Sequence, residues 1–86
     1  MMNNFENATM VDVRTPAEFQ EEHYPGAVNI PVDQVVNRLD EFKKMKAPIV
    51  AYCRSGSRSA LAVSLLRQNG IAEVYNGGSI YDILPQ

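Results

Sequence analysis

A continuous apolar run lies in the middle of the chain and is followed at once by a polar loop. The run is Ile49-Val50-Ala51-Tyr52, and the loop is Cys53-Arg54-Ser55-Gly56-Ser57-Arg58, which has no large apolar side chain. A short run without polar alternation is typical of a strand that is covered on both faces. Residues 59–69 then show apolar side chains at helical spacing, and Gly70 ends that pattern. The order of strand, tight loop and helix predicts a unit of a parallel sheet.

A second strand and helix are predicted near the start of the chain. Residues 10–13 form a short, mostly apolar run, and Thr15, Pro16 and Glu18 follow it. Thr15 can cap a helix through its hydroxyl, proline fits the first helical position, and Glu18 completes a capping box. The segment Tyr24-Pro25-Gly26 ends this helix, because the residue before a proline avoids the helical region.

The rest of the chain continues the alternation of strand and helix signals. Asp33 is the predicted N-cap of a helix whose apolar face consists of Val35, Val36, Leu39 and Phe42. The other predictions are an extended segment at 27–30, a strand at 71–75, a turn at 76–78, and a helix at 79–84 that ends before Pro85. We therefore predict one α/β domain over residues 1–86, with a parallel sheet, helices on both of its faces and right-handed crossovers.

Composition excludes several classes of protein. Of the 86 residues, 45% are hydrophobic and 21% are charged, which is ordinary for a globular domain. The formal net charge of -2 argues against a broad nucleic-acid surface. No apolar run approaches the ~20 residues of a membrane helix, and residues 1–9 lack a secretory signal, so we expect a cytoplasmic protein without a membrane partner. One cysteine and one histidine provide neither a disulfide nor a structural metal site, and no cofactor is expected.

The position of Cys53 favours a reactive thiol. Backbone amides and the positive end of the following helix should surround the sulfur, and Arg54 and Arg58 add positive charge, so the thiol pKa should be low. A lone cysteine is more often a packing residue, but a packing role does not require a loop without large apolar side chains. Gly56 suits such a loop because glycine tolerates positive φ and close approach of the backbone.

Several motifs in order resemble the rhodanese family of sulfurtransferases. The loop Cys-Arg-Ser-Gly-Ser-Arg at 53–58 is similar to the active-site loop of that family. The segments D-V-R at 12–14, E-F at 18–19, H-Y-P-G-A-V-N-I-P at 23–31 and G-G at 77–78 match further family motifs. The resemblance extends over residues 10–84 and is greatest to stand-alone, single-domain rhodaneses.

This resemblance implies a function and a set of site residues. Cys53 would be the catalytic nucleophile that takes sulfur from thiosulfate or another donor as a persulfide, until an external thiol or cyanide removes it. The implied substrate-binding residues are Arg54, Ser55, Gly56, Ser57 and Arg58, and no metal is implied. An alternative is a sulfur-carrier or regulatory module without useful turnover. A phosphatase or arsenate reductase is less favoured, because those loops carry five residues between cysteine and arginine, whereas this loop carries four.

Four other polar residues have a structural interpretation. Asp12 and Arg14 are expected to satisfy polar groups at the end of a strand. His23, the single histidine, is expected to brace its own loop rather than to act as a base. Glu18 is sufficiently explained by the capping box.

Overall fold

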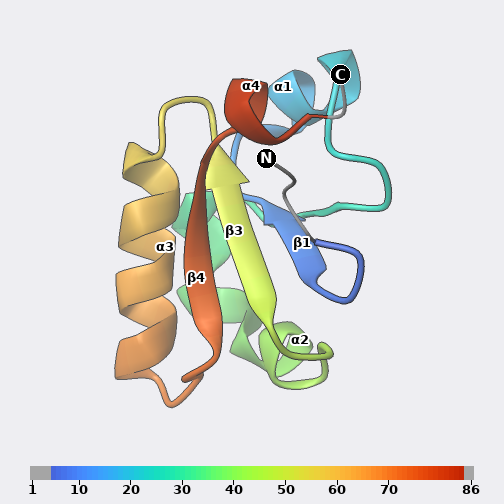
Figure 1. Ribbon diagram of the computed structural model, residues 1–86. Helices are drawn as coiled ribbons and strands as arrows, with labels where there is room; N and C mark the ends of the chain where they lie inside the picture. Colours follow the sequence, from blue (N-terminus) through green and yellow to red (C-terminus); the bar gives the residue numbers. More distant parts are fainter. Residues whose placement is uncertain (1–4, 85–86) are drawn as a thin grey trace.

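Four parallel strands form the centre of the computed structural model, which describes residues 5–84 (Figure 1). The order across the sheet is β2-β1-β3-β4. The strands are β1 Thr9–Asp12, β2 Val28–Asn29, β3 Ile49–Cys53 and β4 Val74–Ser79. Every neighbouring pair is parallel, which confirms the predicted α/β class and parallel sheet.

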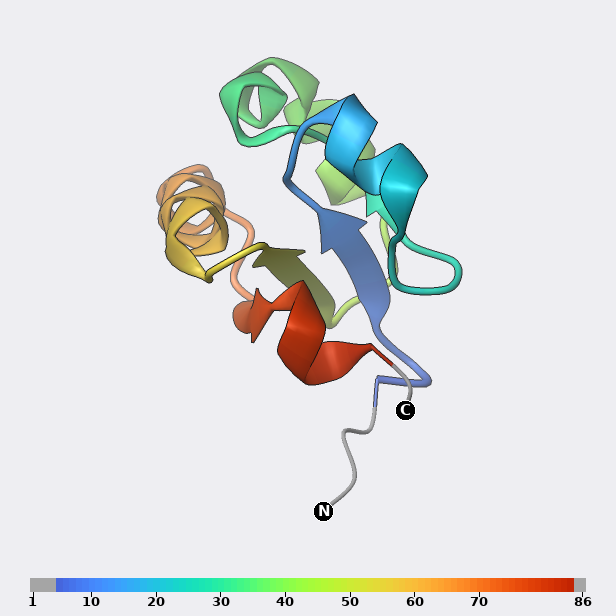
Figure 2. The ribbon, with the colours of Figure 1, turned by 90° about the horizontal axis from the view of Figure 1, so that it is seen from above.

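Helices cover both faces of the sheet, as predicted. The helices are α1 Pro16–Glu21, α2 Leu39–Lys43, α3 Ser57–Gln68 and α4 Ile80–Ile83, with 3-10 turns η1 Val32–Gln34 and η2 Val36–Arg38. Seen from above, α3 and the segment from η1 to α2 lie on one side of β1 and β3, and α4 lies on the other (Figure 2). Within residues 5–84, no helix combines the length and apolar character that a bilayer crossing needs.

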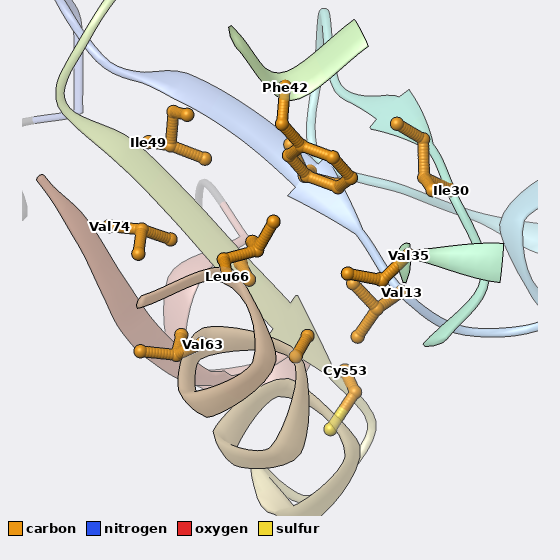
Figure 3. Close-up of a cluster of buried hydrophobic side chains, with 12 residues drawn as sticks. Val13, Ile30, Val35, Phe42, Ile49, Cys53, Val63, Leu66 and Val74 are labelled. Carbon is orange, nitrogen blue, oxygen red and sulfur yellow. The ribbon is translucent and has the colours of Figure 1, made fainter. Parts of the chain in front are cut away.

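The central strand β3 carries the core on both of its faces. All five of its residues are buried, and alternate side chains point to opposite sides of the sheet. Ile49, Ala51 and Cys53 belong to the cluster beneath α3, whereas Val50 and Tyr52 belong to the cluster beneath α4. The larger cluster also receives side chains from α2 and α3, and Cys53 lies at its edge (Figure 3). Cys53 therefore lies at the end of a strand whose residues are all buried.

The capping box at the start of α1 is present as predicted. The Glu18 amide donates to the Thr15 hydroxyl at 3.2 Å, and the Thr15 amide donates to the Glu18 carboxylate at 3.0 Å. These two bonds satisfy backbone donors that the first helical turn leaves free.

The predicted helix after Asp33 is wrong in its form. The segment splits into η1, η2 and the short α2, and Asp33 lies inside η1 rather than at an N-cap. The Val32 amide donates to the Val13 carbonyl at 3.0 Å, which ties the first turn to the end of β1. Val35 is buried but Val36 is 50% exposed, because tight turns do not keep both valines on one face.

The predicted strand at 71–75 is present but shifted along the chain, and the predicted turn at 76–78 is wrong. The strand begins at Val74 and continues through Asn76-Gly77-Gly78 to Ser79. Its register against β3 changes after Ala51, so that one extra residue of β4 forms a bulge. Glycine is required there because a Cβ at Gly77 would lie 2.8 Å from a methyl carbon of Val50. The predicted helix at 79–84 is confirmed as α4, which spans Ile80–Ile83.

Candidate active site

The loop after β3 lies at the carboxyl end of the parallel strands, where α/β sheets bind ligands. Cys53 is the last residue of β3, and α3 begins four residues later, at Ser57. Gly56 precedes the helix with a φ of 96°, a left-handed conformation that favours glycine. In Figure 1 this loop lies at the upper end of the sheet, where α1 and α4 are also found.

Backbone amides converge on the sulfur of Cys53. The Gly56 amide donates to Sγ at 3.0 Å, and the Ser59 amide donates to it at 3.4 Å. The Ser59 hydroxyl oxygen also lies 3.4 Å from Sγ. The side chains of Cys53 and Ser59 are fully buried, so these contacts are shielded from solvent. Donors arranged in this way stabilise negative charge on sulfur.

The pKa of Cys53 is below its ordinary value, as expected, and the predicted backbone amides contribute to the shift. Burial raises the pKa, while hydrogen bonds from the Ser59 hydroxyl and from amides of the loop lower it by more. Those amides belong to Ser59, Ser55 and Gly56. The sequence analysis expected backbone amides, the positive end of the following helix, and the charges of Arg54 and Arg58 to lower the pKa. In the structure the hydrogen bonds within the loop carry the shift, because they reach the sulfur directly.

Arg58 is held by a residue that sequence reasoning assigned only to a helix cap. Its guanidinium donates to both carboxylate oxygens of Glu18, at 2.8 and 3.1 Å. This ion pair joins the first turn of α3 to the first turn of α1. The hydrogen bond from Arg58 and the Thr15 amide lower the pKa of Glu18 to about 2. Arg58 also interacts electrostatically with Cys53.

The other predicted loop residues lie on the outer side of the loop. Arg54, Ser55 and Ser57 are exposed. The hydroxyls of Ser55 and Ser57 are 3.0 Å apart. Of the predicted substrate-binding residues, Gly56 and Ser55 therefore act on the sulfur through their amides, and Arg58 pairs with Glu18.

Asn76 is a site residue that sequence reasoning missed. Its side-chain oxygen accepts from the Ser59 hydroxyl at 2.6 Å and from the Gly78 amide at 2.8 Å. Its side-chain nitrogen donates to the Gly56 carbonyl at 3.1 Å. The N-G-G sequence is typical of a turn, and only the register of β4 brings Asn76 beside the loop.

Asp12, Arg14 and His23 have the structural surroundings that were predicted for them. Arg14 donates to the Asp12 carboxylate at 2.7 Å and to the Glu22 carbonyl at 2.6 Å, and both charged residues are buried. His23 hydrogen bonds to the Phe19 carbonyl through Nδ1 at 2.7 Å and stacks on the Phe19 ring. Within residues 5–84, no group of three His, Cys, Asp or Glu side chains could hold a metal ion.

Comparison with known proteins agrees with this geometry. The family model described as "Rhodanese-like domain" matches residues 1–79. The chain is 42% identical over 72 residues to uncharacterized protein YqhL of Bacillus subtilis, covering 84% of this chain and 56% of that protein. It is 38% identical over 74 residues to thiosulfate sulfurtransferase PspE of Escherichia coli, covering 85% of this chain and 71% of the relative. The chain thus spans about half of the first relative and more of the second.

A solved structure supports the same assignment. A rhodanese from E. coli, described as determined with anions, superposes with a TM-score of 0.82 at 34% identity. The match covers 91% of this chain and 94% of that one. With the cysteine loop at the carboxyl end of a parallel sheet, these similarities establish that the chain belongs to the rhodanese-like domain family.

Proposed function

We propose that this protein transfers sulfane sulfur from thiosulfate, or another anionic donor, to a thiol or cyanide through a persulfide on Cys53. The observation that carries the proposal is the sulfur of Cys53 within hydrogen-bond reach of the Gly56 and Ser59 amides. A thiolate is the nucleophilic form of cysteine, and these donors favour it.

The first half-reaction forms the persulfide. The Cys53 thiolate attacks the outer sulfur of thiosulfate, and a new sulfur–sulfur bond forms at Sγ. The original sulfur–sulfur bond of thiosulfate breaks, and sulfite leaves with its electron pair. One negative charge remains on the outer persulfide sulfur, so the charge balances without an oxidant. Both products are anionic, and fixed donors of the loop stabilise charge where it develops.

Charged and polar groups of the loop support anion binding in this proposal. Arg58 supplies a cation beside the sulfur, held in place by Glu18. Arg54 is exposed on the outer side of the loop and can attract an anionic donor. The hydroxyls of Ser55 and Ser57 offer hydrogen bonds on the same side. These four residues and the Gly56 amide form the proposed substrate-binding loop.

The second half-reaction requires an acceptor from outside the chain. An incoming thiolate attacks the outer persulfide sulfur, and Cys53 leaves as a thiolate. The chain contains one cysteine, so no internal thiol can resolve the persulfide. A free thiol also fits a reducing compartment, and we retain the cytoplasm as the proposed setting.

The experiment is an intact mass measurement after incubation of the reduced protein with thiosulfate. We expect a gain of one sulfur atom, its loss on addition of cyanide, and no gain in Cys53→Ser. A Cys53→Ser variant that still gains the sulfur would refute the proposal. The proposal would also be refuted if the wild-type protein gained no sulfur while its Cys53 thiol still reacted with an alkylating reagent.

A sulfur-carrier role is the second candidate, favoured by the complete burial of Cys53. A donor must displace part of the loop to reach the sulfur, and a partner protein could supply the binding energy for that movement. Loading from a persulfidated donor protein, with none from thiosulfate, would select the carrier role.

An oxyanion hydrolase has less support. The loop encloses four residues between Cys53 and Arg58, and the arginine is already paired with Glu18. Cys53-dependent release of phosphate from an aryl phosphate would be needed to favour that class.

A further inference from the structure

The hydroxyl of Ser59 has one hydrogen and three acceptors within reach. The Asn76 side-chain oxygen is 2.6 Å from Ser59 Oγ, and the Gly56 carbonyl oxygen is 3.1 Å from it. The sulfur of Cys53 is 3.4 Å away. A hydroxyl can donate to one of these acceptors at full strength at any time. The choice of acceptor for this hydrogen therefore affects how strongly the site stabilises a negative charge on the Cys53 sulfur.

The orientation of the Asn76 carboxamide follows from its other two partners. The Gly78 amide can only donate, so the Asn76 atom 2.8 Å from it must be the oxygen. The Gly56 carbonyl can only accept, so the Asn76 atom 3.1 Å from it must be the nitrogen. The side-chain oxygen consequently faces Ser59, which must donate to it. This short contact holds the hydroxyl hydrogen away from the sulfur.

We propose that Asn76 and the sulfur of Cys53 compete for the single hydroxyl hydrogen of Ser59. While Cys53 is a neutral thiol, its S–H can donate to Ser59 Oγ, and Ser59 donates to Asn76. When Cys53 loses its proton, the hydroxyl rotates towards the thiolate, and Asn76 keeps its bond from Gly78. Asn76 is thus a positioning residue that makes ionisation of the thiol harder. The inference rests on the proposed function only in taking the thiolate as the reactive form.

Within residues 5–84, no charged side chain around Cys53 hydrogen bonds to Ser59 or Asn76. Arg58 of α3 interacts electrostatically with the sulfur, and Glu18 of α1 pairs with it. Arg54 is exposed on the outer side of the loop. At the end of β1, Asp12 and Arg14 pair with each other.

The neighbouring β4 and α4 contribute few titratable groups. In β4 the one titratable side chain is Tyr75, which is exposed. The titratable side chains of α4 are Tyr81 and Asp82. Tyr81 is exposed, and Asp82 interacts with another group. Within the described residues, neither tyrosine hydrogen bonds to Ser59, so the effect of Asn76 on the sulfur should pass through the Ser59 hydroxyl.

The test is a double-mutant cycle read through the pH dependence of Cys53 alkylation by iodoacetamide. The four proteins are the wild type, Asn76→Ala, Ser59→Ala and the double variant. Removing Asn76 frees the Ser59 hydrogen and also removes the hydrogen bonds of Asn76 with Gly56 and Gly78. The Ser59→Ala background contains no such hydrogen and reports the loss of those two bonds alone.

Asn76→Ala should change the alkylation midpoint in both backgrounds. We expect this change to be more negative, by about 0.5 to 1 pH unit, when Ser59 is present than when it is replaced by alanine. Equal shifts in both backgrounds, or a difference of opposite sign, would overturn the proposal. Asn69→Ala is the matched control: Asn69 lies at the far end of α3 and donates to the Leu65 carbonyl, so the midpoint should not move.

A second variant covers the case in which Asn76→Ala does not fold. Asn76→Asp retains the size of the side chain and replaces the amide with a stronger, charged acceptor. We expect a higher alkylation midpoint, and a smaller rise when Ser59 is also replaced by alanine. An unchanged midpoint in Asn76→Asp, or a rise of the same size without Ser59, would contradict the competition.

The mass assay with thiosulfate separates this inference from the proposed function. If Cys53 gains sulfur from thiosulfate but the midpoint shifts of Asn76→Ala and Ser59→Ala are additive, the competition is refuted and the proposed sulfur transfer still stands. Coupled shifts without sulfur loading would support the competition and refute transfer from thiosulfate.

Discussion

Replacing Glu18 by glutamine should destabilise the fold in a pH-dependent way. Glu18 accepts from Thr15 in the capping box and from both nitrogens of the Arg58 fork. Glutamine has one acceptor oxygen, and its NH₂ group would face either the Thr15 amide or an Arg58 N–H, which are themselves donors. The change therefore removes the ion pair between α1 and α3 and also weakens the start of α1.

The magnitude follows from the pKa of Glu18. A shift from 4.5 to about 2 corresponds to about 3 kcal/mol of favourable interaction with the charged form. The side chains of Glu18 and Arg58 are 22% and 34% exposed, so solvent screens the pair. We expect a loss of about 1–2 kcal/mol in the free energy of unfolding at neutral pH. For a domain of this size, each 1 kcal/mol lowers Tm by about 4–8 °C.

The pH dependence has a definite sign. Because the pKa of Glu18 is lowered in the folded state, its contribution is fully present above about pH 4.5. The contribution is lost as the pH falls towards about 2, where the folded-state carboxylate takes up its proton. The stability difference between wild type and Glu18→Gln should therefore narrow over this range.

Urea denaturation at a series of pH values measures this difference. Glu41→Gln is the matched control, because Arg38 also donates to both oxygens of Glu41, but within one exposed helical segment. That pair should matter much less, since exposed pairs between near neighbours contribute little. Equal losses in the two variants, or a Glu18→Gln loss that stays constant down to about pH 3, would refute the reasoning.

Three further predictions concern the thiol, the bulge and the core. The alkylation rate of Cys53 should rise with pH through a midpoint below the ~8.5 of an unperturbed thiol, and a midpoint at or above that value would contradict the hydrogen-bonded thiolate. Gly77→Ala should cost about 1–3 kcal/mol in urea denaturation, because its Cβ would lie 2.8 Å from Val50. The cost should fall in a Val50→Ala background, and strict additivity would argue against the steric cause. Leu66→Ala should cost about 2–5 kcal/mol, because the side chain is fully buried. Leu61→Ala, 53% exposed on the same helix, should stay within about 0.5 kcal/mol, and similar losses at both positions would contradict the packing.

Predictions that depended on neighbouring residues were the most accurate. The capping box at Thr15 and the buried strand before Cys53 each rest on a few adjacent side chains, and both are present. The loop at 53–58 was likewise placed correctly between a strand and a helix. Helix α3 begins at Ser57, two residues earlier than expected, because Gly56 supplies the N-terminal turn.

Predictions failed where a distant strand or helix overrode a local pattern. The N-G-G segment is typical of a turn, yet pairing with β3 extends β4 through it. The valines after Pro31 suggested one helix, but a hydrogen bond to Val13 and the burial of Val35 produced separate turns. Propensity is a weak preference of the order of ~1 kcal/mol per residue, which such tertiary contacts readily exceed.

Local patterns in the sequence were sufficient to predict the α/β class, the buried strand that leads to Cys53, and the polar loop between that strand and α3. These features depend on periodicity and capping over short stretches of chain, where local sterics and hydrogen bonding decide the outcome. The tertiary structure alone decided that Glu18 holds Arg58 and that Asn76 holds Ser59, across 40 and 17 positions of the chain. The physical reason is that strand register and helix packing set which distant polar groups meet, and the energy that sets them comes from burial of the whole core.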